Sequence, residues 1–262
     1  MQYHLSCNRF ASTSQTHYHF AMNNIALTQI GLPASRATAP RALFATDWDG
    51  LHGIETPGFN VAYLQRDVSL ARALASWVME PPPQGQDAST SASRSKEVVC
   101  EWEGAPALCP LLDLLAPLPH EARVQVQADL EALLPRFARW TKRNHVRIHL
   151  SQVRDDACRR FHVDFIGLRA LITYAGKGTE WVESQYARRD QVGRSDLDLD
   201  AANLAVVPDL SKVRYAREGD LLVLKGEAFE GNRGFGAIHR SPPCSPLTPR
   251  LVLRVDVPQC GC

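Results

Sequence analysis

The chain has 262 residues, with 29 basic and 28 acidic side chains and a hydrophobic content of 45%. This length and composition suit one large globular domain with a sizeable core. The net charge of +1 favours neither nucleic acid nor an anionic membrane as a partner. No apolar run reaches the length of a membrane span, and the first 40 residues lack the basic-then-apolar order of a secretory signal. We therefore expect a cytoplasmic protein.

Seven cysteines are spread over the chain, an odd number that does not suggest a disulfide framework. We expect reduced thiols. Cys260 and Cys262 are separated by one residue in the tail 258–262. Such a pair can capture a soft metal ion, or it can be an inert tail, and both interpretations stay open.

The first half of the chain predicts an extension followed by a mainly helical region. Residues 1–40 are rich in polar side chains without a sustained period, so we expect poor order there. In the region 41–144, apolar residues recur at helical spacing over 68–79. A flexible loop by composition, residues 81–95, comes next, and a short strand is expected at 97–102.

A second helix is predicted after Pro119, because proline suits the first turn and an amphipathic segment follows it. Pro135 should kink or end this helix. The pattern then changes, since apolar residues alternate with polar ones over 145–153, which is typical of a strand.

Beyond this strand the sequence predicts mainly short strands separated by turn residues. The segments concerned are 161–164, 168–174, 180–183, 204–207, 221–224, 237–240 and 251–257. Many short strands of this kind favour a sandwich or barrel. The predicted fold class is therefore α+β: a C-terminal double-stranded β-helix (jelly roll, cupin-like) over 145–257, buttressed by N-terminal helices.

An HxD motif, FHVD, offers two metal-binding side chains. On a strand His162 and Asp164 point to the same face, because side chains alternate with period two. A third ligand must come from a distant strand, and His239 in GAIHRSPP is well placed. Two imidazoles and one carboxylate suit a mononuclear Fe(II) site that keeps coordination positions open. An arginine soon after the second histidine, Arg250, can hold an acidic cosubstrate beside the metal.

The surroundings of these residues resemble the Fe(II)/2-oxoglutarate-dependent dioxygenase superfamily over residues 145–257. The resemblance lies in the order of four segments: FHVDFIGLRALITYAGKGTEWV, REGDLLVLKG, GAIHRSPP and PRLVLRVD. The FHVD, GTEW and IHRSPP stretches also resemble a bacterial domain-of-unknown-function family, DUF1826. This second resemblance supports the fold and assigns no activity.

The superfamily resemblance implies roles for individual residues. His162, Asp164 and His239 would bind iron, and Arg250 would pair with the far carboxylate of 2-oxoglutarate. Tyr174 would hydrogen-bond the cosubstrate, or else it is an ordinary core tyrosine. Arg254 shares strand parity with Arg250 and is a competing carboxylate holder.

Four further residues are candidates for substrate contact. Thr179 and Trp181 follow a glycine turn and could line the substrate mouth, although plain packing is the alternative. Asn232 and Arg233 lie in a glycine-rich segment before His239, which is equally consistent with a mobile loop.

Three functions follow from these patterns. The first is an Fe(II)/2-oxoglutarate-dependent oxygenase that hydroxylates a small molecule or peptide of unspecified identity. The second is a non-catalytic, cupin-like protein that binds zinc with the same ligands or serves metal homeostasis. The third is a scaffold in which the triad is structural. A buried Arg250 directed at the metal favours the first, and an exposed Arg250 favours the second.

Overall fold

The structure is a computed structural model that describes residues 39–67, 72–79, 94–101, 115–143, 145–154, 158–245 and 247–257. All of these belong to one unit, Ala37–Cys262. The predictions for the extension before residue 39 and for the tail 258–262 lie outside the described residues. The predicted loop 81–95 also lies outside them, apart from its last two residues, which begin a strand.

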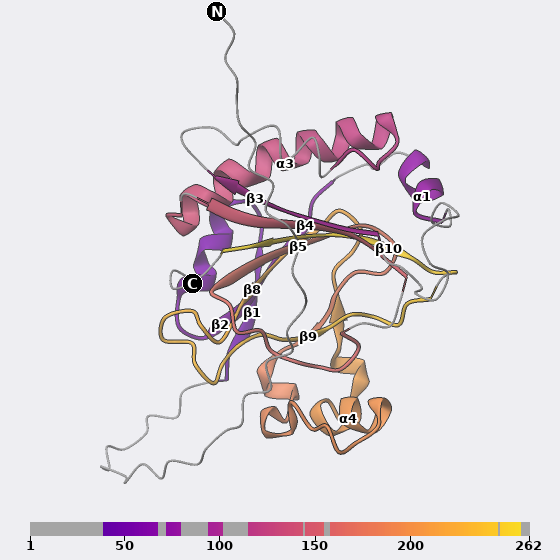
Figure 1. The fold of residues 1–262 in the computed structure, drawn as a ribbon. Coiled ribbons are helices and arrows are strands. Elements are labelled where there is room, and N and C mark those ends of the chain that lie inside the picture. Colours follow the sequence, from indigo (N-terminus) through magenta and orange to yellow (C-terminus); the bar gives the residue numbers. More distant parts are fainter. Residues whose placement is uncertain are drawn as a thin grey trace, which may run out of the picture. The chain divides into compact units, whose positions relative to one another are not determined.

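The main element is a seven-stranded sheet (Figure 1). Its strands lie in the order β1 (Arg41–Ala45), β2 (Phe59–Leu64), β8 (Leu221–Lys225), β5 (Leu168–Ala175), β10 (Arg250–Asp256), β4 (His145–Val153) and β3 (Arg94–Glu101). Neighbouring strands are antiparallel, except that β1 and β2 are parallel. Strands from both ends of the chain therefore share one sheet.

A smaller sheet faces one side of the seven-stranded sheet. It consists of β7 (Arg214–Tyr215), β6 (Glu180–Val182) and β9 (Ile238–Arg240), in that order. The predicted strand 161–164 is reduced to a single bridge between His162 and His239. This bridge nevertheless fixes the HxD segment beside β9.

Three α-helices are described: α1 (Arg72–Met79), α3 (His120–Thr141) and α4 (Leu199–Val206). Four short 3-10 helices connect other elements: η1 (Asp49–Glu55), η2 (Ser184–Tyr186), η3 (Arg189–Gln191) and η4 (Leu210–Lys212). Helix α3 begins after Pro119, as predicted, but it continues through Pro135 and therefore does not end there. Among the described residues no helix is both long enough and apolar enough to cross a membrane.

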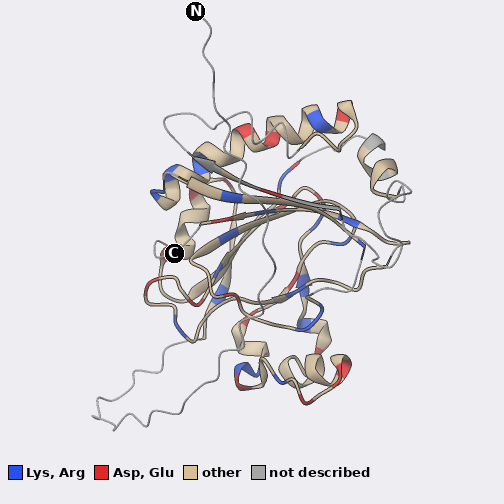
Figure 2. Ribbon diagram, in the orientation of Figure 1, with Lys and Arg blue, Asp and Glu red and all other residues tan. Residues whose placement is uncertain are grey.

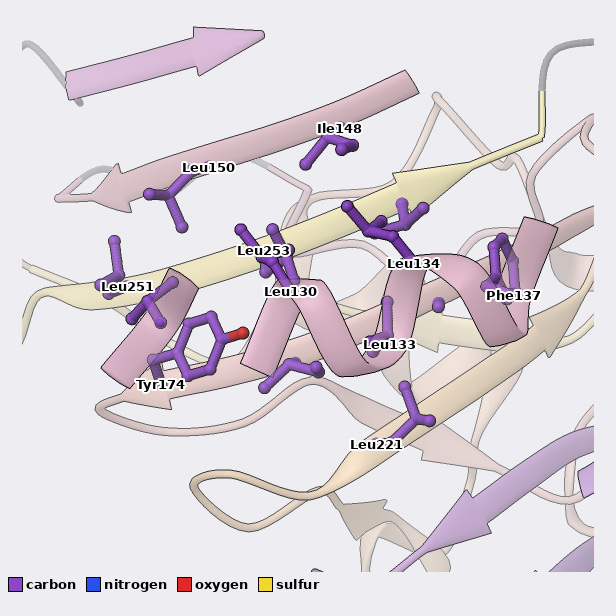
Figure 3. Close-up of a cluster of buried hydrophobic side chains, with 14 of the residues drawn as sticks. Leu130, Leu133, Leu134, Phe137, Ile148, Leu150, Tyr174, Leu221, Leu251 and Leu253 are labelled. Atoms are coloured by element: carbon purple, nitrogen blue, oxygen red, sulfur yellow. The ribbon is translucent and has the colours of Figure 1, made fainter. Parts of the chain in front are cut away.

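Helix α3 covers the face of the large sheet opposite the small sheet (Figure 1). Figure 3 shows Leu130, Leu133, Leu134 and Phe137 of α3 packed over the strands, and all four are buried. Burying one such side chain contributes about 1.5–3 kcal/mol to folding. The solvent side of α3 carries both acidic and basic residues (Figure 2).

A second apolar cluster fills the space between the two sheets. Its members are Val61, Leu171, Trp181, Ala216, Leu222, Leu224 and Ala237. Leu171 lies here while its neighbour Ile172 packs on the α3 side. Successive side chains along β5 therefore pack into two different apolar clusters, one on each face of the large sheet.

Two sequence-based predictions need correction. The region 41–144 contains helices α1 and α3, but β1 and β2 in it are strands of the large sheet that the sequence did not predict, and β3 matches the strand expected at 97–102 only in part. Strand β2 is buried at consecutive positions, so its sequence lacks an alternating pattern. The segment 204–207 is not a strand, since helix α4 ends in it. Asp198 caps that helix by accepting a hydrogen bond from the amide of Ala201 at 2.8 Å.

Candidate metal centre

The three predicted metal ligands lie together between the two sheets. The Nε2 atom of His239 is 3.1 Å from Oδ2 of Asp164, and the Nε2 atom of His162 is 3.8 Å from Oδ1 of Asp164. The two imidazole rings are 4.4 Å apart between centroids. One ligand atom from each residue lies within 4.8 Å of the others, which is compatible with a shared ion.

Backbone pairing explains this convergence. The amide of His162 donates to the carbonyl of His239 at 3.0 Å, and the amide of His239 donates to the carbonyl of His162 at 3.0 Å. Each ring also has its Nδ1 atom near a backbone carbonyl, that of Arg160 at 2.9 Å and that of Ala237 at 3.1 Å. A ring that donates from Nδ1 leaves Nε2 free to bind a metal ion.

The charge states also suit metal binding. Burial lowers the pKa of His162, and the neighbouring His239 lowers it further, so a neutral ring is favoured. Burial raises the pKa of Asp164, but in the metal-free protein its hydrogen bond to His239 and the charges of His239 and Arg169 outweigh burial, so the net pKa lies well below its usual range. An ionised carboxylate is the form that acts as a ligand, and a metal ion would take the place of the His239 proton that Asp164 binds.

Arg169 is a site residue that the sequence reasoning missed. Its guanidinium donates to Oδ2 of Asp164 and forms two bonds with Asp256, at 2.6 Å from Nε and 2.9 Å from Nη2. Arg169 stands on β5, five residues after Asp164, with the same inward parity as Leu171. The only hint in the sequence was the position of Arg169 in the FIGLR segment, directly after the FHVD motif.

Arg250 is buried, with 2% of its surface exposed, and lies in the same cavity as the two histidines. Its Nη2 atom is 3.5 Å from the hydroxyl of Thr179. In the part of the chain that the structure describes, no carboxylate forms an ion pair with Arg250, and its Nε atom has no hydrogen-bond partner. Burial lowers the pKa of Arg250 to about 10, so the side chain is still cationic at neutral pH.

Arg254, the competing carboxylate holder, also borders the cavity but differs in its environment. Its side chain is 32% exposed and pairs with Asp256 at 3.1 Å and with Glu97 at 3.6 Å. Its charge is therefore already compensated. The unpaired cation inside the cavity is Arg250, as the sequence favoured.

The cavity measures about 250 Å³. Beyond the histidines and the two arginines just described, it is lined by Arg169, Leu171, Thr179, Val252, His149, Ser151, Val153, Cys158, Arg240 and Ser241. Burial lowers the pKa of His149, and the charge of Arg254 lowers it further. Cys158 is an exposed thiol at the rim, and its backbone has a positive φ of 59°. Of the four predicted substrate residues, only Thr179 lines this cavity.

Tyr174 lies on the other face of the sheet, and its predicted cosubstrate contact is wrong. The residue is fully buried beneath α3, where its hydroxyl donates to Asp129 at 2.8 Å (Figure 3). Asp129 also binds Arg66 at 2.7 Å. Burial and the charge of Asp129 raise the pKa of Tyr174 well above its ordinary value. Its alternative interpretation, a core tyrosine with an ordinary partner, is the correct one.

The remaining substrate candidates do not line this cavity, although Trp181 pairs with His239 across β6 and β9. Trp181 is buried in the apolar cluster between the sheets. Asn232 is buried and donates to the carbonyls of Gly226 at 2.9 Å and Lys225 at 3.3 Å, which fixes a loop. Arg233 is exposed. Neither Asn232 nor Arg233 borders the cavity, so the glycine-rich segment does not place them near a bound substrate.

Solved structures similar to this chain share little sequence with it. A full-length Neurospora crassa protein in complex with alpha-KG is 13% identical, with a TM-score of 0.39 over 79% of this chain and 75% of that chain. The dioxygenase for auxin oxidation in rice is 13% identical, with a TM-score of 0.41 over 83% and 82%. The 2-oxoglutarate complex of the dioxygenase for auxin oxidation 1 from Arabidopsis thaliana is 11% identical, with a TM-score of 0.43 over 84% and 92%.

No curated protein sequence matches the chain significantly. A protein-family profile does match it, over residues 45–256, and that family is described as "Protein of unknown function (DUF1826)". The match includes the small sheet, the large sheet apart from most of β1, and every residue of the candidate metal centre. The chain therefore belongs to the DUF1826 family.

Proposed function

We propose that the protein is an Fe(II)/2-oxoglutarate-dependent oxygenase that hydroxylates its substrate. One observation carries the proposal: a buried arginine without a carboxylate partner shares a cavity with two histidines, and both histidines lie close to the carboxylate of Asp164. We also propose that the two facing sheets form the double-stranded β-helix that the sequence resemblance implies.

The donor set fits a ferrous ion. His162, His239 and Asp164 would supply two imidazole nitrogens and one carboxylate oxygen, a set that leaves further coordination positions open. Bound together with 2-oxoglutarate and dioxygen, the iron would supply the oxidising chemistry. The His162 side chain is 32% exposed, whereas that of His239 is 6% exposed, so substrate would approach from the His162 side.

Arg250 fits the second carboxylate of 2-oxoglutarate. A buried cation is costly unless an anion compensates it, and the planar guanidinium can bind a carboxylate through two hydrogen bonds. The Thr179 hydroxyl is at hand as a further donor. Leu171 and Val252 supply apolar walls that would exclude water from the bound acid.

Arg169 would hold the Asp164 carboxylate in place. Its two hydrogen bonds to Asp256 fix the guanidinium, so the third donor, Nη1, restrains the orientation of Asp164 toward the histidines. This restraint would position one ligand before any metal ion arrives.

The zinc-binding alternative uses the same three ligands but gives Arg250 no role. A zinc-binding or metal-homeostasis protein has no need of a buried, uncompensated cation beside its ion. Arg250 therefore favours the oxygenase. We propose separately that the enzyme acts in the cytoplasm on a small molecule or peptide.

The test is an anaerobic Fe(II) titration of the purified protein, with and without 2-oxoglutarate. A visible charge-transfer band is expected only when both are present. His239→Ala should abolish the band by removing a ligand, and Arg250→Ala should weaken 2-oxoglutarate binding by at least about tenfold.

Arg254→Ala is the matched control, because Arg254 borders the same cavity but is already paired. The band should survive this change. Tight zinc binding without a band in the wild-type protein would refute the oxygenase proposal and favour the metal-binding alternative.

A further inference from the structure

A second cavity, of about 530 Å³, borders the edge strands β1 and β7. It is lined by Phe44, Tyr63, Trp181, Tyr186, Ser211, Lys212, Val213, Arg214, Tyr215 and Arg217. These residues come from β1 and β7, from their neighbours β2 and β6, from η2, and from the segments that flank β7. The two cavities share no lining residue.

Aromatic side chains make up half of the lining. The whole chain has only nine Phe, five Trp and six Tyr, and five of these residues meet in this one cavity. Tyr215, Phe44 and Tyr186 are 68%, 53% and 40% exposed. Lys212 lies 5.5 Å from the ring centroid of Tyr186 and Arg214 lies 5.3 Å from that of Phe44, so one face of each of these rings already contacts a cation. Tyr215 is the most exposed of the three, and exposed rings around a hollow can stack a flat ligand whatever its exact ring.

The charge of the lining is entirely positive. Lys212, Arg214 and Arg217 border the cavity, and no acidic side chain among the described residues does. Arg214 pairs with Glu183 at 3.4 Å. Within the described ranges, neither Lys212 nor Arg217 forms an ion pair. Two cations that form no ion pair, beside aromatic rings, attract an anion.

Arg214 holds the aromatic wall in place. Its guanidinium carbon is 5.3 Å from the ring centroid of Phe44 and 5.8 Å from that of Trp181, distances suited to cation–π attraction. The Phe44 ring also contacts Tyr63, with centroids 6.0 Å apart. The wall is thus arranged in advance, which lowers the cost of binding a ligand against it.

Another aromatic cavity serves as a comparison. Trp48 and Trp140 border a hollow with Arg136 and Arg139, but Asp47 and Asp49 border it too. Two acids there balance two arginines. The excess of positive charge distinguishes the cavity beside β1 and β7.

We propose that the cavity beside β1 and β7 binds a small planar aromatic anion, a base carrying a phosphate as in a nucleoside monophosphate. The base would stack on Phe44 or Tyr215, and the phosphate would lie beside Lys212 and Arg217. The volume lies within the range of small-molecule sites, about 300–1,000 Å³. Because the cavities are separate, this site is independent of the proposed oxygenase function.

The test is calorimetric titration of the full-length protein with AMP, adenosine and inorganic phosphate. AMP should bind at least about tenfold more tightly than either fragment, because only AMP uses both the rings and the cations. The variant Lys212→Ala/Arg217→Ala should lose about tenfold in AMP affinity, and Tyr215→Ala should lose severalfold. All three positions are exposed, so folding should be preserved, and thermal unfolding checks this.

Lys177→Ala is the control, an exposed lysine that does not border the cavity. It should bind AMP like the wild type. Absence of AMP binding, or equal binding by the double variant and the wild type, would overturn the proposal. Tighter binding of oligothymidylate than of AMP would replace the mononucleotide with a nucleic acid strand. A dimer in sedimentation that Tyr215→Ala dissociates, without AMP binding, would show that a second copy of the chain covers this surface.

Discussion

Arg169 joins the carboxylate of Asp164 to that of Asp256, and so it ties a candidate metal ligand to strand β10. The side chains of Arg169, Asp164 and Asp256 are 13%, 20% and 12% exposed. At this degree of burial the pairing is only weakly screened by solvent. Burial lowers the pKa of Arg169, but the hydrogen bond to Asp256 and the two carboxylate charges outweigh it and raise the pKa. The guanidinium is thus a permanent cation that keeps Asp164 ionised.

Replacing Arg169 with glutamine should weaken metal binding without removing a ligand. Asp164 would lose its restraint, and loss of such a supporting contact costs about 10–100-fold in metal affinity. Titration with Co(II), followed by its visible spectrum, measures the change. Arg194→Gln is the matched control, because Arg194 also binds an aspartate, Asp196 at 2.6 Å, but does so on the surface. Equal Co(II) affinity for both variants would show that Arg169 does not position Asp164.

The sequence predicted which side chains converge at the candidate metal centre better than it predicted their surroundings. The HxD spacing required His162 and Asp164 to share a face, and His239 and Arg250 followed from the resemblance. Arg169 was missed because a single arginine in an apolar strand carries no periodic signal. Its role depends on Asp256, which is 87 residues away along the chain and faces Arg169 across the β5–β10 pairing.

Strands were predicted correctly where apolar and polar side chains alternate along the sequence, and they were missed where no such alternation exists. Strand β4 alternates and was placed at its observed bounds, 145–153. Strand β2 packs against apolar clusters on both of its faces, so its sequence shows no alternation of apolar and polar residues. The apolar segment 204–207 is too short for its pattern to distinguish a strand from a helix. In the structure it forms the end of α4, whose first turn is capped by Asp198.

Changing Tyr174 to phenylalanine should affect stability and leave cosubstrate binding intact. Asp129 would lose one donor in a buried position, which costs about 1–3 kcal/mol. Urea unfolding should show this loss, while the 2-oxoglutarate affinity of the iron-loaded protein should match the wild type. Weaker 2-oxoglutarate binding with unchanged stability would contradict this prediction and would indicate that Tyr174 contacts the cosubstrate.

The metal-free protein should lose stability as the pH falls below about 6.5, the ordinary pKa of histidine. Burial lowers the pKa of His162 and of His149, so between the folded and ordinary values the unfolded chain binds more protons than the folded one. Stability therefore rises with pH through that window. Asp164, whose pKa lies below its usual range, loses its contribution only at more acidic pH, below about 3.8.

Urea unfolding in the presence of EDTA, at about pH 7.5 and about pH 5.5, measures this dependence. The double variant His149→Gln/His162→Gln should show a smaller difference between the two pH values than the wild type does. His120→Gln is the control, because His120 lies at the start of α3, away from the cavity. A difference that the double variant fully retains would assign the effect to other groups.

Gly178 places Thr179 beside Arg250, and a methyl group at this position should disturb cosubstrate binding. A Cβ atom on Gly178 would lie 1.9 Å from the carbonyl oxygen of Ala216, so one strand must move. The amide of Ala216 donates to the carbonyl of Thr179 at 3.1 Å, and the Thr179 hydroxyl lies 3.5 Å from Arg250. Displacing this backbone would therefore shift the surroundings of the buried guanidinium.

Gly193→Ala separates this effect from a general loss of stability. Gly193 has a φ of +87°, and a methyl group there would meet no atom within 4 Å, so alanine costs backbone strain of about 1 kcal/mol and touches no site residue. Both variants should unfold at lower urea concentration than the wild type. Only Gly178→Ala should also weaken 2-oxoglutarate binding, because only Gly178 lies in the segment that places Thr179 beside Arg250, just before β6. Equal cosubstrate affinity in the two variants would mean that Arg250 holds its anion without help from this backbone.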